Sequence, residues 1–267
     1  MMNKRLYFLS GLPRAGNTLL GSILNQNPLI SATANSVVNE MCRDLMKLKD
    51  SDVFKNYPDH QSFDNVIKSV FNLYYKDWKK PIIVDRAPWG APNNLRFLKE
   101  YFPELNIKIV VLVRDVLEVL SSFIRWSEKE PTAYVNRFGA KNVEEKCDML
   151  MNTEGLIVRE LIAIKHLIDH QPKELYHIIE YNDLVDDTEN TINNIYSFLN
   201  ITPFKHNFKK LQQFEVNGMA YDDEKAVGKN LHTIKTNGIK KTKFDVKKVL
   251  PESVINKYGN LNVWIKQ

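Results

Sequence analysis

Short apolar runs alternate with stretches of helical periodicity along most of this 267-residue chain. Four runs have the length and composition of buried strands, at 6–9, 81–84, 107–113 and 175–179, while 29–36 fits either a strand or a loop. Apolar residues recur at helical spacing in the segments between them, most regularly in 63–74. This alternation predicts an α/β fold: a single domain over residues 1–267 with a central parallel β-sheet flanked by helices.

The later part of the chain is less regular. Residues 143–168 are predicted to be helical with one interruption at Gly155, and 192–199 carry a second apolar helical stripe. Residues 215–242 are polar, contain three glycines and are predicted to form loops. A short helix over 247–257 is expected to follow.

Composition narrows the class of protein. Hydrophobic residues make up 43% and charged residues 26% of the chain, which is typical of a globular protein, and no stretch approaches the ~20 apolar residues that span a bilayer. Cys42 and Cys147 are too few for a disulfide scaffold, and the N-terminus leads into a strand rather than a signal peptide. We therefore expect a cytoplasmic protein without a membrane span.

The net charge and the spacing of the histidines indicate which kinds of ligand to expect. The formal net charge of +5 favours an anionic partner. The sequence has no zinc finger, recognition-helix pattern or aromatic-studded basic stripe, so we expect no nucleic-acid partner. The six histidines show no metal-ligand spacing with carboxylates, and no metal site is predicted.

The first strand is followed by a turn rich in glycine, residues 10–16, and then by a helix-forming run to about residue 26. A turn of this kind directs backbone N–H groups and the positive end of the helix dipole at one point, which suits an anion. It is not a Walker A loop, because the Gly-Lys-[Ser/Thr] ending is missing and Arg14 lies inside the turn. An ordinary strand–turn–helix connection is the alternative.

Arginines follow three of the predicted strands: Arg14, Arg86 and Arg114. Any one of them alone is more often a surface or ion-pairing residue. Because parallel strands bring their carboxyl ends to the same sheet edge, the three side chains are expected to converge there. Guanidinium groups match the oxygens of phosphate and sulfate, so we expect a polyanionic ligand.

Two of these segments resemble the sulfotransferases that use 3′-phosphoadenosine 5′-phosphosulfate (PAPS). Gly11-Leu12-Pro13-Arg14-Ala15-Gly16-Asn17-Thr18 is similar to their 5′-phosphosulfate loop, usually Pro-[Lys/Arg]-Ser-Gly-Thr-Thr. Arg114 with Ser122, eight residues later, resembles the arginine–serine pair that holds the 3′-phosphate. The resemblance implies a P-loop-like strand–turn–helix that binds the phosphosulfate.

The resemblance covers about residues 6–236 and is strongest to the tyrosylprotein and bacterial branches. Arg86 stands where that branch has a catalytic lysine, and Tyr181 matches a tyrosine that contacts the nucleotide. Residues 228–235 resemble the late loop that covers the nucleotide, which implies contacts from Lys229, His232 and Lys235.

The implied activity is transfer of a sulfuryl group from PAPS to an acceptor hydroxyl or amine by in-line displacement, with PAP as product and no metal. Arg14 and Arg86 would stabilise the charge that develops, and Glu40 is the carboxylate nearest to the family's base position. The chain departs from the family pattern in three places. Ala15 and Asn17 replace hydroxyl residues, although the Asn17 amide could donate in place of one, and Arg86 replaces lysine.

Two other functions stay open at this stage. A P-loop kinase for a small molecule or nucleotide would need ATP and magnesium, and the missing Walker lysine disfavours it. A non-catalytic nucleotide-binding protein is favoured if no residue serves as base. The acceptor and the oligomeric state have no signature in the sequence.

Overall fold

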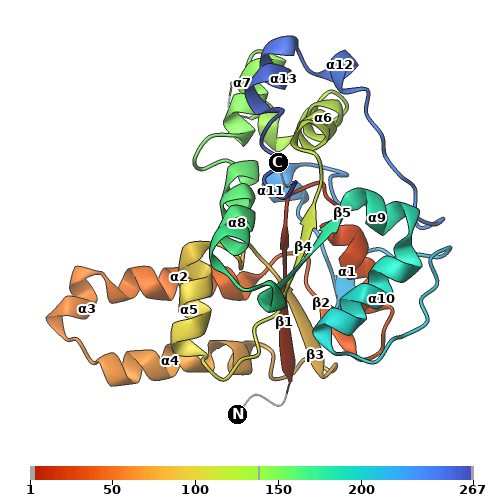
Figure 1. Ribbon diagram of the computed structural model, residues 1–267. Helices are drawn as coiled ribbons and strands as arrows, with labels where there is room; N and C mark the ends of the chain where they lie inside the picture. The colour runs from red at the N-terminus through yellow and green to blue at the C-terminus, as the bar shows by residue number, and fades with distance from the viewer. Residues whose placement is uncertain (1–3, 138, 266–267) are drawn as a thin grey trace.

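The computed structural model describes residues 4–137 and 139–265. Its centre is a parallel sheet with the strand order β2-β3-β1-β4-β5 (Figure 1). The strands are β1 (Arg5–Gly11), β2 (Ile30–Ala32), β3 (Ile82–Arg86), β4 (Ile109–Val113) and β5 (Tyr176–Glu180). The four predicted strands are present, and the ambiguous segment contributes the short edge strand β2.

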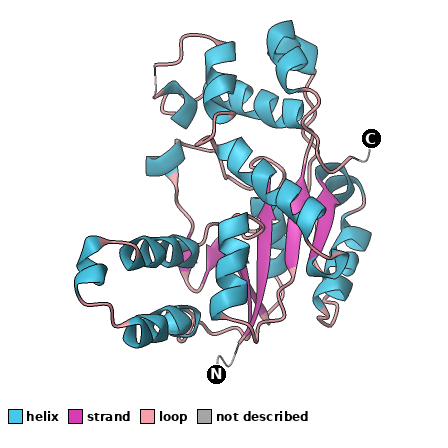
Figure 2. Ribbon diagram, turned by 60° about the vertical axis from the view of Figure 1, so that its left-hand side comes forward, coloured by secondary structure: helices cyan, strands magenta, loops and turns pink. Residues whose placement is uncertain are grey.

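Helices cover both faces of the sheet (Figure 2). They are α1 (Asn17–Asn25), α2 (Val37–Lys49), α3 (Asp52–Asn56), α4 (His60–Tyr74), α5 (Pro92–Tyr101), α6 (Val116–Ser127), α7 (Val143–Leu150), α8 (Leu156–His170), α9 (Tyr181–Asp186), α10 (Thr188–Leu199), α11 (Glu224–Val227), α12 (Val246–Val249) and α13 (Glu252–Tyr258). The α/β fold predicted from the sequence is confirmed. The predicted interruption at Gly155 separates α7 from α8, and the predicted last helix is divided into α12 and α13.

The sheet core is apolar and tightly packed. Every residue of β4 is buried, as expected for a strand with helices on both faces. On one face the ring of Phe8 lies 5.0 Å from that of Trp89 and 6.3 Å from that of Phe71 on α4. Such edge-to-face and tilted contacts stabilise the packing beyond the area that they bury.

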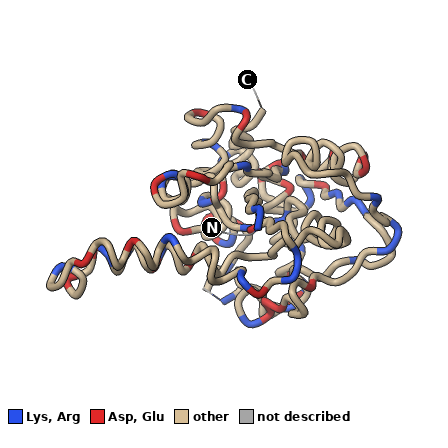
Figure 3. Tube along the Cα trace, turned by 90° about the horizontal axis from the view of Figure 1, so that it is seen from below, with Lys and Arg blue, Asp and Glu red and all other residues tan. Residues whose placement is uncertain are grey.

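Helices α2, α3 and α4 form an arm that projects from the body of the molecule, with both signs of charge along it (Figure 3). Its first helix begins next to the sheet edge. Ser36 caps α2 by accepting a hydrogen bond from the Asn39 amide, and its hydroxyl donates to Asp85 at the end of β3.

The predicted loop region 215–242 is mostly irregular and includes the two-residue strands β6 (Glu215–Val216) and β7 (Met219–Ala220). Its last part lies over the carboxyl ends of the sheet strands. Leu231 and Ile234 are buried there, and the carbonyl of Thr242 accepts a hydrogen bond from Arg114. None of the described helices has the length and apolar character needed to cross a membrane.

Candidate functional site

The turn after β1 depends on unusual backbone angles. Gly11 has φ +133°, and a Cβ atom there would lie 2.2 Å from the carbonyl oxygen of Leu112 on β4. Arg14 and Gly16 also have positive φ values, of 63° and 97°. α1 starts directly afterwards, and no side chain caps it. Its first N–H groups are therefore available to an anion.

Two cavities meet at this turn. Cavity A, of about 360 Å³, is lined by residues that include Asn35, Glu40, Arg86, Glu160 and Asp223. Cavity B, of about 380 Å³, is lined by residues that include Arg114, Ser122, Tyr181, Lys235 and Phe244. The residues that line both are Arg14, Gly16, Thr18, Leu231 and His232. The site lies where the strand order reverses beside β1, the usual ligand position in open α/β sheets.

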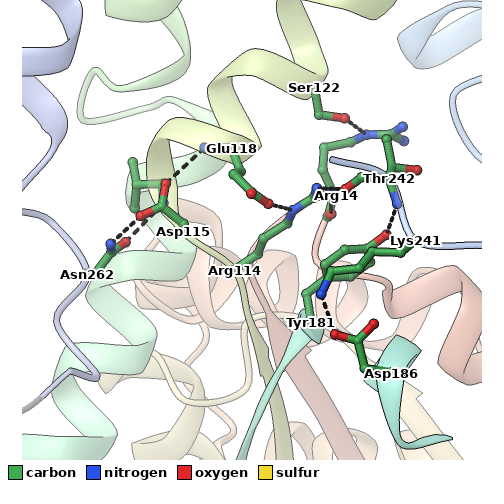
Figure 4. A network of polar contacts seen from close by, with 11 residues as sticks. Arg14, Arg114, Asp115, Glu118, Ser122, Tyr181, Asp186, Lys241, Thr242 and Asn262 are labelled. Atoms are coloured by element: carbon green, nitrogen blue, oxygen red, sulfur yellow. Dashed lines mark hydrogen bonds and ion pairs between the residues drawn. The ribbon is translucent and has the colours of Figure 1, made fainter. Parts of the chain in front are cut away.

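Arg114, which lines cavity B, is held by a network of polar contacts (Figure 4). Its Nε donates to Glu118 at 2.9 Å, Nη1 to the Arg14 carbonyl at 3.2 Å and Nη2 to the Thr242 carbonyl at 2.6 Å. Its guanidinium carbon lies 4.0 Å from the centre of the Tyr181 ring. Tyr181 in turn accepts a hydrogen bond from the Thr242 amide at 2.9 Å.

Arg14 lies between the two cavities. Its Nε donates to the Ser122 hydroxyl at 3.0 Å, and its Nη1 donates to the Leu231 carbonyl. Burial and the positive charge of Arg114 lower the pKa of Arg14 to about 10. The positive charges of Arg14 and Arg114, which repel each other, favour an anion between them.

Arg86 reaches cavity A from the end of β3. Its Nη2 pairs with Glu160 Oε1 at 3.1 Å, and its Nη1 donates to Asn35 at 2.9 Å. The other Glu160 oxygen accepts from the Ser10 hydroxyl and the Gly11 amide. Burial raises the pKa of Glu160, although Arg86 opposes that rise. Arg86 Nε is buried without a partner among the described residues.

The three arginines thus meet at one sheet edge, with Arg14 in the middle. Arg86 lies in cavity A and Arg114 in cavity B, so they flank the turn on opposite sides. Pro13 and Thr18 also line the site, whereas Ala15 is buried in the core.

Three other predicted residues lie in less direct positions. The Asn17 side-chain amide donates to the Leu12 carbonyl at 2.8 Å and so braces the turn, and its contact with the sulfate donor stays a prediction. Lys229 is exposed and lines neither cavity; its carbonyl accepts from Trp126 at 2.9 Å. Glu40 lines cavity A, but its half-exposed carboxylate is paired with Arg43.

Two carboxylates of the site were not predicted. Glu160 lies on the apolar face of α8 with Ile157, Leu161 and Ile164. An ionisable residue in an apolar stripe is a recognisable signal of a buried charge. Asp223 contacts His232 across an irregular segment, and no periodicity could have indicated that pair. No three His, Cys, Asp or Glu residues among those described are grouped closely enough to hold a metal ion.

Two solved structures with a similar fold and low sequence identity are sulfotransferases. The sulfotransferase domain from the curacin biosynthetic pathway is 16% identical with a TM-score of 0.51, over 99% of this chain and 93% of that one. A mouse sulfotransferase in complex with PAP is 11% identical with a TM-score of 0.54, over 98% and 84% of the two chains. No curated protein matches the sequence.

The sequence itself matches a family model over residues 7–206, and that family is described as the sulfotransferase family. The match spans most of the chain and includes most of β1, the turn, Arg86, Arg114, Ser122 and Tyr181. The chain therefore belongs to the sulfotransferase family.

Proposed function

We propose that this protein transfers a sulfuryl group from PAPS to an acceptor hydroxyl or amine and releases PAP. The observation that carries the proposal is the pair of cavities that meet at Arg14, with Arg114 on one side and Arg86 on the other. Family membership supports sulfuryl transfer, and the mouse relative is a complex with PAP.

Cavity B is the proposed donor site. The first amides of α1, Thr18 and Arg14 would hold the 5′-phosphosulfate. Arg114 and Ser122 would hold the 3′-phosphate, while Tyr181 stacks on Arg114 and orients it. Lys235 lines the same cavity and adds positive charge.

The hydrogen-bond donors that line cavity B suit a nucleotide with an anionic group at each end. Arg114 has N–H donors left after its contacts with Glu118, Arg14 and Thr242. Its contact with the Thr242 carbonyl is one that a phosphate oxygen could replace with a stronger, charge-assisted hydrogen bond.

Cavity A is the proposed acceptor site, with Arg86 at its boundary. As the bond between sulfur and the bridging oxygen breaks, negative charge grows on that oxygen, and Arg14 and Arg86 would stabilise it. The Glu160 carboxylate and the side-chain oxygen of Asn35 hold the Arg86 guanidinium group in place before the reaction. The chemistry resembles phosphoryl transfer, where positioning and charge stabilisation supply most of the catalysis.

Calorimetry with PAP and with ATP tests the donor. We expect PAP to bind at least about tenfold more tightly than ATP, and Arg114→Ala to weaken PAP binding by about 10- to 100-fold, since charge-assisted contacts are lost. Arg96→Ala on α5, exposed and outside both cavities, is the control. Tighter binding of ATP with no effect of Arg114→Ala would favour a kinase.

Turnover separates an enzyme from a binding protein. Radiolabelled PAPS incubated with phenols, alcohols, sugars and amines should yield at least one labelled sulfated product. Tight PAP binding without transfer to any acceptor class would favour the non-catalytic alternative.

A further inference from the structure

We propose that His232 is the general base that removes the proton of the acceptor, and that Asp223 positions it. This inference rests on the proposed sulfuryl transfer. It replaces the expectation that Glu40 is the base, and it gives His232 a role other than nucleotide binding.

The imidazole has the hydrogen-bonding arrangement of a base. Nδ1 of His232 lies 2.5 Å from Oδ2 of Asp223. A carboxylate only accepts hydrogen bonds, so it fixes the proton on Nδ1 and leaves the lone pair on Nε2. No described residue forms a hydrogen bond with Nε2.

His232 lies where the two substrates would meet. It lines both cavities, together with Arg14, Gly16 and Thr18 of the phosphosulfate turn. With the donor in cavity B and the acceptor in cavity A, the sulfuryl group has to lie at this junction. The imidazole is 27% exposed, so it is open to the cavities while its other side is anchored.

Asp223 is fixed in turn by its neighbours. The Tyr221 hydroxyl donates to Asp223 at 3.1 Å and accepts from the Asn35 amide at 2.8 Å. The side-chain oxygen Oδ1 of Asn35 accepts a hydrogen bond from Arg86 at 2.9 Å. One network of hydrogen bonds therefore joins the proposed base to the arginine of cavity A. Burial opposes ionisation of Asp223, but the His232 and Tyr221 contacts outweigh it and lower its pKa.

The two other carboxylates of cavity A are less suited to the role. Glu40 is half-exposed and paired with Arg43. Glu160 has both oxygens engaged, by Ser10, the Gly11 amide and Arg86. His232, by contrast, lines both cavities and has no hydrogen bond from Nε2 to any described residue.

The proposed sulfuryl transfer needs no reactant besides PAPS and the acceptor. Nε2 takes the proton from the acceptor oxygen or nitrogen as that atom forms its bond to sulfur. The bond from sulfur to the bridging phosphate oxygen breaks, and PAP leaves with the electron pair. The imidazolium, stabilised by the Asp223 carboxylate, then releases the proton to solvent.

The test measures labelled transfer from PAPS to the best acceptor of the panel above, alongside PAP affinity by calorimetry. We expect His232→Asn to lower kcat by about 10²- to 10⁴-fold while PAP affinity changes less than about threefold. His170→Asn, exposed on α8 and outside both cavities, should match the wild type.

Asp223 has a separate test, because it acts through the histidine. Asp223→Asn should lower kcat while the KM for the acceptor and the PAP affinity stay near wild type, and Asp223→Glu should restore part of kcat. A purely structural role would change binding and stability together with kcat.

The outcomes separate the two proposals. If His232→Asn transfers the sulfuryl group as fast as the wild type, the base assignment is overturned and the donor proposal stays intact. Loss of PAP affinity in proportion to loss of turnover also overturns it, since His232 would then be a nucleotide ligand. Wild-type protein that transfers to no acceptor overturns the catalytic proposal and the base with it.

Discussion

Gly11 shows how single residues set up the candidate site. It ends β1 at the point where the chain leaves the sheet, with its Cα packed against the backbone of Leu112. Its amide also donates to Glu160, the carboxylate that holds Arg86. One position therefore serves strand packing, the turn and the ion pair of cavity A.

A methyl group at Gly11 should be poorly tolerated. Gly11→Ala puts a Cβ atom against backbone atoms that cannot move aside and forces an alanine into a positive φ. We expect it to lower the free energy of unfolding by more than about 3 kcal/mol, measured by urea denaturation. Gly218→Ala, with φ +76° but open space around it, is the control and should cost about 1–2 kcal/mol. Equal effects would show that the contact with Leu112 is unimportant.

The positions of site residues could be predicted from the sequence where a motif has a fixed spacing. Arg14, Arg114 and Ser122 were placed in one cluster from motif and strand position, and the structure brings them together. The contact of the Asn17 side-chain amide with its own loop could not be predicted, and Asp223 is recognisable only after the fold brings it to His232.

At the scale of elements, the start of α2 links the projecting arm to the sheet. Ser36 caps the helix and also donates to Asp85, a fully buried carboxyl that accepts from Tyr75 and Trp89 as well. Burial raises the pKa of Asp85, and the hydrogen bonds oppose that rise. The cap therefore stabilises the helix and satisfies a buried acceptor at once.

Loss of this hydroxyl should cost more than loss of an ordinary cap. Ser36→Ala removes the cap and one donor to a buried carboxyl, so we expect a loss of about 2 kcal/mol in the free energy of unfolding. Ser51→Ala, at the cap of α3 and without a contact to a buried carboxyl, is the matched control and should cost less than about 1 kcal/mol. Similar losses in both variants, measured by chemical denaturation, would contradict a role for the contact with Asp85.

Elements with strong periodicity were predictable and the irregular ones were not. Phe63 to Tyr74 was identified by its apolar stripe alone. β2 has three residues, too few for a pattern to separate a strand from a loop. The path of 229–244 over the sheet edge depends on contacts such as that of Arg114 with Thr242, which no local pattern encodes.

At the scale of the whole molecule, the segment that follows α10 closes one side of the fold. His206 lies there against Phe204 and Phe208, and its Nε2 is 2.9 Å from the Tyr196 hydroxyl on α10. Burial lowers the pKa of His206 to about 4. The folded protein therefore resists protonation of this ring.

This predicts a loss of stability in mild acid. The unfolded chain protonates His206 near pH 6.5, but the folded chain does so only near pH 4, so stability falls as the pH drops between these values. His206→Gln should remove about 1 kcal/mol of that fall, less than the full pKa change implies, because the ring is partly solvated. His170→Gln is the control. An unchanged pH dependence of the unfolding midpoint in His206→Gln would contradict the assignment.

We propose above all that cavity B recognises a nucleotide by its 3′-phosphate. The most direct test compares the binding affinities of PAP and AMP, which differ only in that group. We expect the wild-type protein to bind PAP about 100-fold more tightly than AMP, and Arg114→Ala to abolish most of the difference while AMP affinity stays nearly unchanged. Equal affinities for PAP and AMP in the wild type would contradict it.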